Sequence, residues 1–155
     1  MKDYEISIKN AKEVSIYKTD NDTLVIPSSS DIETDKNNTE IKIKDVEEAV
    51  IGIPKEAGHI ELSIEDASLT VKGISFERME IDGKGKLVIN LDDIAGSIDV
   101  NLIDGSAEMT VPSAYSFKAR TEGKNNTIDC QAQEDAAAEN IIELNGRNST
   151  LLIRN

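Results

Sequence analysis

The sequence predicts an all-β, single-domain β-solenoid built from repeated units of about 28–30 residues. Three observations support this prediction: short runs of alternating apolar and polar residues, turn-forming clusters between them, and a regular spacing. Alternation with period two is typical of strands that bury one face. Repetition at a fixed period is typical of stacked arrays. An antiparallel β-sandwich also has short, evenly spaced strands and is the alternative fold.

The expected strands are short alternating segments along the whole chain. They cover residues 6–8, 41–43, 60–64, 69–71, 87–91, 98–102, 115–119 and 142–144. Clusters of Asn, Asp, Gly and Ser between them supply turns, because these residues suit turn backbone conformations. The core must be aliphatic, since the chain has two Phe, three Tyr and no Trp. Residues 46–49 and 134–140 are each compatible with one helical turn, too short to be stable alone.

The repeat length comes from the positions of residues that end strands. Pro27 and Pro54 are one unit apart, and Pro112 follows two units later, with Gly83 in the empty slot. Proline suits a strand end because it cannot donate to the next ladder. A second strand recurs in step with these anchors, at Ile41, Leu69, Ile98 and Ile128. We expect these four side chains to line up in adjacent layers of the interior.

The turn residues that precede this second strand recur with the same period and support the same repeat length. The tetrapeptide Lys-Asn-Asn-Thr occurs at 36–39 and again at 124–127, while 65–68 and 95–97 occupy the same slot in the two units between. A partial fifth turn follows at 146–150. The expected domain therefore spans 1–155, with an irregular N-terminal cap at 1–22, repeats at 23–49, 50–79, 80–107 and 108–138, and a C-terminal partial repeat at 139–155.

The charge of the chain restricts its partners. Thirty acidic and 17 basic residues give a net charge of −13, which repels nucleic-acid phosphates and anionic lipid head groups. No apolar run approaches the ~20 residues of a membrane span. We therefore expect no nucleic-acid partner and no membrane insertion. No signal-peptide pattern follows Met1, so we expect a cell-surface or envelope location if a longer precursor exists, and a cytoplasmic one if Met1 is the native start.

No group of residues predicts a catalytic centre or a cofactor. His59, the single histidine, is expected in a turn, and Cys130, the single cysteine, as a small buried filler that alternates with Ile128. The candidates for the carboxylates that a glycosidase or lyase would need are Glu65-Asp66, Asp92-Asp93 and the strand-spaced Asp31, Glu33 and Asp35. Calcium is the only metal with candidate ligands, which are weak: half of a calcium loop and three acids on one side of a strand. These ligands are Asp20, Asp22, Asp31, Glu33 and Asp35.

The chain resembles the bacterial putative-adhesin β-strand-repeat domains, also called toastrack domains, from about Thr23 onward. The residues that carry the resemblance are the stretch 93–102, Asp-Ile-Ala-Gly-Ser-Ile-Asp-Val-Asn-Leu, its continuation at 105–112, and 145–153. The resemblance implies a β-solenoid-like fold, often in cell-envelope proteins, without known catalytic residues. The chain departs from many such proteins because no signal-peptide pattern follows Met1 in this sequence.

The leading functional hypothesis is a non-enzymatic, adhesin-like interaction or scaffold module of a bacterial envelope or surface protein. Its partner would be a protein or a glycan, and copies could associate through the open ends of the sheets. The alternative is a carbohydrate-active enzyme, a polysaccharide lyase or hydrolase on a short β-helix, in which Asp92 or Asp93 is essential. The positions expected to form the contact faces are Lys42, Lys44, Glu61, Ser63, Thr70, Asp99 and Asn101.

Overall fold

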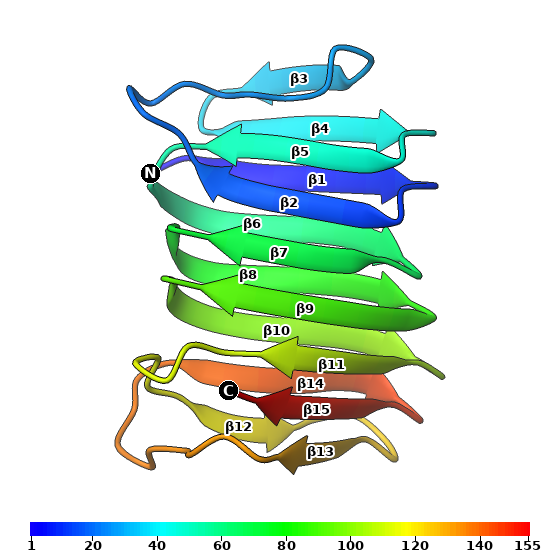
Figure 1. The fold of residues 1–155 in the computed structure, drawn as a ribbon, viewed down its shortest axis with the longest axis vertical. Helices are drawn as coiled ribbons and strands as arrows, with labels where there is room; N and C mark the ends of the chain where they lie inside the picture. Colours follow the sequence, from blue (N-terminus) through cyan, green and yellow to red (C-terminus); the bar gives the residue numbers. More distant parts are fainter.

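The computed structural model describes residues 1–155 and consists of strands stacked in two facing sheets (Figure 1). The strands are β1 (Asp3–Lys9), β2 (Glu13–Lys18), β3 (Asp31–Asp35), β4 (Asn38–Lys44), β5 (Glu48–Ile53), β6 (Glu56–Glu65), β7 (Ser68–Lys72), β8 (Ser75–Lys84), β9 (Lys86–Asp92), β10 (Ala95–Ile103), β11 (Ser106–Thr110), β12 (Lys118–Thr121), β13 (Thr127–Cys130), β14 (Ile141–Arg147) and β15 (Thr150–Arg154). Neither 46–49 nor 134–140 forms a helix. Nothing in the structure qualifies as an apolar helix of membrane-spanning length.

The two sheets are almost entirely parallel. Sheet A has the order β12-β14-β10-β8-β6-β1-β4-β3, and sheet B has the order β13-β15-β11-β9-β7-β2-β5. One coil consists of a strand of sheet A, a corner and the next strand of sheet B, so the chain winds through both sheets in turn. Only β3 runs antiparallel to its neighbour, β4. The predicted all-β solenoid is therefore confirmed, and the antiparallel sandwich is not the fold.

The predicted repeat length is wrong, because one coil is shorter than the predicted unit. In sheet A, Ile60 pairs with Met79 and Met79 with Ile98, so equivalent positions recur at 60, 79 and 98. In sheet B, Leu69 pairs with Ile89, which gives nearly the same interval. The boundaries 23–49, 50–79, 80–107 and 108–138 consequently cut across coils.

The four side chains expected in one column are also distributed differently. Ile41 and Ile98 lie in sheet A, whereas Leu69 and Ile128 lie in sheet B. Even within sheet A the columns differ, since Ile41 pairs with Ile6, whereas Ile98 pairs with Met79 and Ile142. The error arose from the anchors: Gly83 lies inside β8, and the first Lys-Asn-Asn-Thr segment is a hairpin between β3 and β4 rather than a coil corner.

The feature that repeats once in every coil is a residue with a left-handed backbone conformation. It lies at the corner between each sheet A strand and the sheet B strand that follows. Every such corner contains one residue with φ between 44° and 75°: Asn10, Asp45, Asp66, Gly85, Asp104, Asn125 and Asn148. Asn, Asp and Gly are the residues that adopt this conformation at the lowest cost. The corner side chains also bond along the stack, since Asn148 Nδ2 donates to Asp104 Oδ1 at 3.0 Å and Asn125 Nδ2 donates to Asn148 Oδ1 at 3.2 Å.

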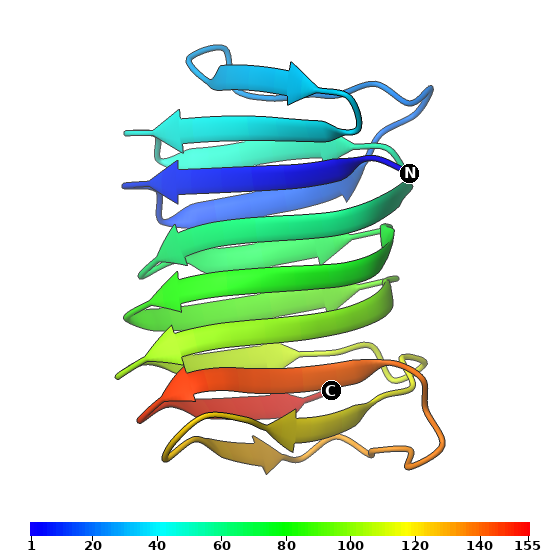
Figure 2. The ribbon, with the colours of Figure 1, turned by 180° about the vertical axis from the view of Figure 1, so that it is seen from behind.

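The spatial order of the coils departs from the sequence order at both ends. The coil β1–β2 lies between β4–β5 and β6–β7, and the coil β14–β15 lies between β10–β11 and β12–β13 (Figures 1 and 2). Each terminal coil is therefore hydrogen-bonded on both sides. One end of the stack is the penultimate coil, β12–β13. At the other end β4–β5 is the outermost complete coil, and β3 pairs beyond β4 in sheet A.

The interior is one cluster of 38 buried residues that runs through the whole stack. Its inward columns are aliphatic, as in the series Ile41, Ile6, Leu62, Ile81, Val100 and Leu144. Burying one such side chain contributes about 1.5–3 kcal/mol. Aromatic residues gather near the β12 end, where the rings of Tyr115 and Phe117 stack with centroids 5.6 Å apart. Burial raises the pKa of the Tyr115 hydroxyl, which donates to the Gly96 carbonyl.

Candidate functional site

The outer face of sheet A carries a column of acidic side chains that crosses the sheet. The parallel register sets Glu5 between Glu40 and Glu61, and the same position continues on the other strands. Adjacent strands lie about 4.8 Å apart, so these side chains are close neighbours. We call the seven acids the acidic ladder: Glu33, Glu40, Glu5, Glu61, Glu80, Asp99 and Glu143, in spatial order from β3 to β14. Arg120 occupies the eighth position, on β12.

Arginines neutralise the acidic ladder near its β12 end. Arg78 forms an ion pair with Asp99, and Arg120 forms one with Glu143. These two carboxylates are only 7% and 6% exposed, so they need such partners. Burial acts to raise the pKa of Glu143, but hydrogen bonds from Asn145 and Arg120 hold that pKa below its usual value.

Unneutralised carboxylates lie in the middle of the face. Glu61, Glu80 and Asp82 each offer an oxygen within 4.8 Å of the others, and none of them forms an ion pair. Asn101 Nδ2 donates to Glu80 Oε1 and to Asp82 Oδ1, both at 2.7 Å. Partial burial, followed by the charges of Glu80, Asp82 and Glu5, raises the pKa of Glu61. We call these four acids, Glu5 included, the central carboxylate cluster. Its oxygens have the chemistry to attract ammonium or guanidinium groups, or a hard cation such as calcium.

A groove of about 530 Å³ lies beside the central carboxylate cluster and crosses β1, β6, β8 and β10. Along one side the register sets Ser7, Ser63, Asp82 and Asn101. Two positions further along the same strands come Lys9, Glu65, Lys84 and Ile103. The groove and the cluster share Asp82 and are therefore adjacent, but the lining of the groove also includes the apolar residues Ile8, Ile64, Leu102 and Ile103.

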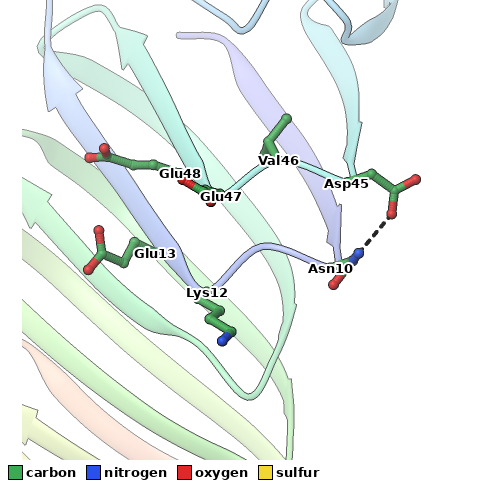
Figure 3. A pocket seen from close by; sticks show the side chains of 7 residues that line it. All are labelled: Asn10, Lys12, Glu13, Asp45, Val46, Glu47 and Glu48. Carbon is green, nitrogen blue, oxygen red and sulfur yellow. Dashed lines mark hydrogen bonds between the residues drawn. The ribbon is translucent and has the colours of Figure 1, made fainter.

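A second hollow, of about 520 Å³, lies where the β1–β2 and β4–β5 corners meet (Figure 3). Its lining is polar except for Val46. Asn10 Nδ2 donates to Asp45 Oδ1 at 2.9 Å, which is a contact between neighbouring corners. Figure 3 shows Glu13 and Glu48 extending to one side and Asp45 to the other. The carboxylates do not converge on one point, so this hollow offers no single ion site.

The single histidine and the single cysteine lie apart. The expectation of a turn for His59 is wrong, because His59 lies exposed inside β6, where its backbone N–H donates to Asp3 Oδ1 at 2.8 Å. Cys130 is half-buried on β13, at the far end of the stack. Burial, then the charge of Glu134, raises the pKa of the Cys130 thiol, which disfavours the reactive thiolate.

The acidic pairs considered for a glycosidase or lyase lie at coil corners. Asp93 has a φ of 48° in the corner before β10, and Asp92 pairs with Lys72 at 3.8 Å. Asp66 is a left-handed corner residue whose carboxylate accepts the Lys86 N–H at 2.9 Å. Three of these four acids therefore have a local structural role.

The calcium candidates fall into two groups near the β3 end. Asp31, Glu33 and Asp35 share the outer face of β3, as their alternation predicts, and Asp31 lies opposite Lys42. Asp20 and Asp22 belong to the irregular segment between β2 and β3. The one group of three acids with mutually close oxygens lies elsewhere, in the central carboxylate cluster. Calcium binding at the five residues predicted from the sequence stays a prediction.

Six of the seven positions expected on the contact faces are accessible: Lys42, Lys44, Glu61, Ser63, Thr70 and Asn101. Asp99 is buried instead, because its ion pair with Arg78 covers it. Thr70 lies on sheet B, and the others lie on the outer face of sheet A.

The acidic ladder was missed in the sequence, although a signal for it exists. Glu61, Glu80 and Asp99 follow one another at the same interval as the corner residues Asp66, Gly85 and Asp104. Two kinds of residue repeating at one interval would have revealed both the coil length and the column.

No family model and no curated protein matches the chain. The crystal structure of a putative cell adhesion protein from Clostridium sporogenes ATCC 15579 is similar in fold, with a TM-score of 0.61 and 14% sequence identity. The match covers 99% of this chain and 92% of that chain. At this identity the likeness concerns the fold, because one fold supports many functions. The chain therefore shares the fold of that protein over nearly its whole length.

Proposed function

We propose that this chain is a non-enzymatic, adhesin-like interaction module of a bacterial envelope or surface protein. Its contact surface is the outer face of sheet A, and its partner is a protein segment rich in lysine or arginine. The observation that carries the proposal is the acidic ladder with the unneutralised central carboxylate cluster. The structural likeness to a cell adhesion protein supports the adhesin-like role, by analogy of fold.

The physical reason for expecting a cationic partner is the repulsion between the carboxylates of the central carboxylate cluster, which destabilises the isolated chain. Like charges on directly opposed residues of neighbouring strands destabilise a sheet. Glu61 and Glu80 are such a pair, and neither has a basic partner in the isolated chain. A cationic segment would remove this repulsion on binding, so part of the cost is recovered in the complex. Complementary charge also accelerates encounter and restricts the choice of partner.

The rigidity of the stack favours the same role. The strands that carry the cluster, β1, β6 and β8, are each hydrogen-bonded on both sides. Their side chains are therefore held in a fixed array before any partner arrives. Preorganisation reduces the ordering cost of binding.

Binding of fluorescent lysine-rich, neutral and acidic peptides tests the proposal. The informative variant neutralises Glu61→Gln, Glu80→Gln and Asp82→Asn without a change of shape. The matched control makes the same change of net charge on the outer face of sheet B, at Glu13→Gln, Glu108→Gln and Asp129→Asn. We expect the sheet A variant to lose more than about tenfold in affinity for the lysine-rich peptide, and the control much less. Equal losses would mean general charge attraction and would refute a specific face.

The absence of enzymatic activity belongs to the proposal and needs its own test. Incubating the protein with uronic-acid polymers in the presence of calcium should leave the polymers intact. Depolymerisation that Asp92→Asn or Asp93→Asn abolishes would replace the proposal with the carbohydrate-active alternative.

A further inference from the structure

The two outermost strands of sheet A carry opposite charge. At one end of the stack β3 presents Asp31, Glu33 and Asp35 on the outer face of the sheet. At the other end β12 presents Lys118 and Arg120 on the same face. An outermost strand is a template for another strand, and its charges decide which strand can pair with it.

We propose that copies of this chain associate head to tail, with β12 of one copy pairing beside β3 of the next. This inference concerns the ends of the stack and does not rest on the proposed function. β3 is antiparallel to the other strands of sheet A. If the next copy has the same orientation as the first, its β3 would therefore run antiparallel to β12 of the first. Continuing the column of the acidic ladder sets Arg120 opposite Glu33 of the next copy. In that register Lys118 lies opposite Asp35, so both facing pairs have opposite charge.

The same charges disfavour the two symmetric arrangements. Pairing β3 with β3 would set acids against acids, and pairing β12 with β12 would set Lys118 and Arg120 against each other. Discrimination by like-charge repulsion is a general source of specificity. A head-to-tail contact uses two different surfaces of each copy, so the assembly is an open series rather than a closed dimer.

Apolar surface at the two ends supports the contact. Ile32 on β3 is 45% exposed, and Val25, which bridges to Gly52 of β5 at the same end of the stack, is 40% exposed. At the other end, Ile128 and Cys130 are only partly buried against the core. In the proposed register Ile32 lies opposite Thr121, on the inward side of sheet A. Stacking the ends would therefore bury aliphatic surface on both copies, which favours association.

Two residues of the segment that follows β13 already bond to the free edge at β12. The Asp135 N–H donates to the Phe117 carbonyl, just before β12, at 2.8 Å, and Glu134 contacts β12 itself. The N–H groups of Lys118 and Glu122 point to the β14 side, where they donate to carbonyl groups. Because N–H groups alternate sides along a strand, the Ala119 N–H points away from β14. It donates to Glu134 Oε1 at 2.7 Å. Glu134 is exposed and must move aside before another strand can pair here, so it limits association.

Sedimentation velocity over a wide range of protein concentrations, at low salt, tests the inference. The wild-type chain should form a series of dimers, trimers and larger species. Lys118→Glu and Asp35→Lys should each weaken association by more than about tenfold. Lys55→Glu and Glu77→Lys make the same charge changes away from the ends and should associate like the wild type. Glu134→Ala should strengthen association by about fivefold, because it frees an N–H donor.

Mixing the two end variants gives the decisive measurement. The Lys118→Glu chain and the Asp35→Lys chain each repel their own kind, but each presents an end that matches the other. An equimolar mixture should therefore associate as the wild type does. Circular dichroism of each variant checks that the fold is retained. A wild type that stays monomeric at every concentration, a closed dimer, or a mixture that stays monomeric would overturn the proposal.

Discussion

The outer faces of sheets A and B differ, although the same coils build both. Sheet A carries the acidic ladder, in which one register position is acidic on seven successive strands. The corresponding column of sheet B is mixed: Glu48, Glu13, Ser68, Val88, Glu108, Leu152 and Asp129. Both faces cover the same aliphatic interior. The difference teaches that packing constrains only the inward positions, and the outward columns of a solenoid are free to carry a chemistry of their own.

The largest effects are expected in the interior, where the two sheets contribute equally to one core. Leu62 of sheet A and Leu69 of sheet B are both fully buried. Truncation to alanine leaves a cavity in the continuous core, so Leu62→Ala and Leu69→Ala should each lower the free energy of unfolding by about 2–5 kcal/mol. Urea denaturation measures this. A small effect in only one sheet would contradict a shared core.

The next effect separates the outer faces. Arg78→Met on sheet A removes the partner of the buried Asp99 carboxylate and should destabilise the chain by about 1–3 kcal/mol. The control is Arg154→Met on sheet B, whose ion pair with Glu108 at 3.8 Å is half exposed. Exposed pairs contribute little, so the control should change stability by less than about 1 kcal/mol. Equal losses in urea denaturation would show that burial of Asp99 has no energetic consequence.

A smaller effect of opposite sign is expected within the central carboxylate cluster. Glu61→Gln keeps the shape of the side chain and removes a charge that faces Glu5 and Glu80, so it should stabilise the chain by a few tenths to about 1 kcal/mol. Glu108→Gln on sheet B removes a charge that pairs with Arg154 and should not stabilise. Thermal melting at low salt compares the two, and a gain for both would point to the overall net charge instead.

The smallest effect is a pH dependence that differs between two members of the acidic ladder. The pKa of Glu61 is raised in the folded chain, so the folded state binds the proton more tightly than the unfolded state does. Stability therefore falls as pH rises from the usual glutamate pKa through the raised one. The gain from Glu61→Gln should be full at neutral pH and vanish on acidification.

Glu143 should behave in the opposite way. Its pKa is lowered, so its contribution to stability is present above the usual glutamate pKa and is lost as pH falls through the lowered value. Urea denaturation across the acidic range, for the wild type, Glu61→Gln and Glu143→Gln, measures both trends. Two variants with the same pH dependence would refute the distinction between neutralised and unneutralised parts of the acidic ladder.

The local features of the fold were predictable, and the spacing of the coils was predictable only in part. Alternation at 60–64, 87–91 and 98–102 identified strands that the structure contains. The spacing of the prolines predicted the wrong repeat length, because the three prolines are not equivalent positions. Pro54 and Pro112 lie at strand ends between coils, whereas Pro27 lies in the irregular segment before β3. The left-handed corners at Asp66, Gly85 and Asp104 carried the true interval between coils.

The sequence by itself determined the strands, the aliphatic core and the corners, because alternation and left-handed backbone preference act over a few residues. Only the tertiary structure decided that β1–β2 lies between β4–β5 and β6–β7, and that β14–β15 lies inside the stack. All coils present similar aliphatic inner faces, so no local pattern specifies which coil stacks on which. The acidic ladder depends on that order, since Glu5 and Glu143 join it only through the inserted strands β1 and β14.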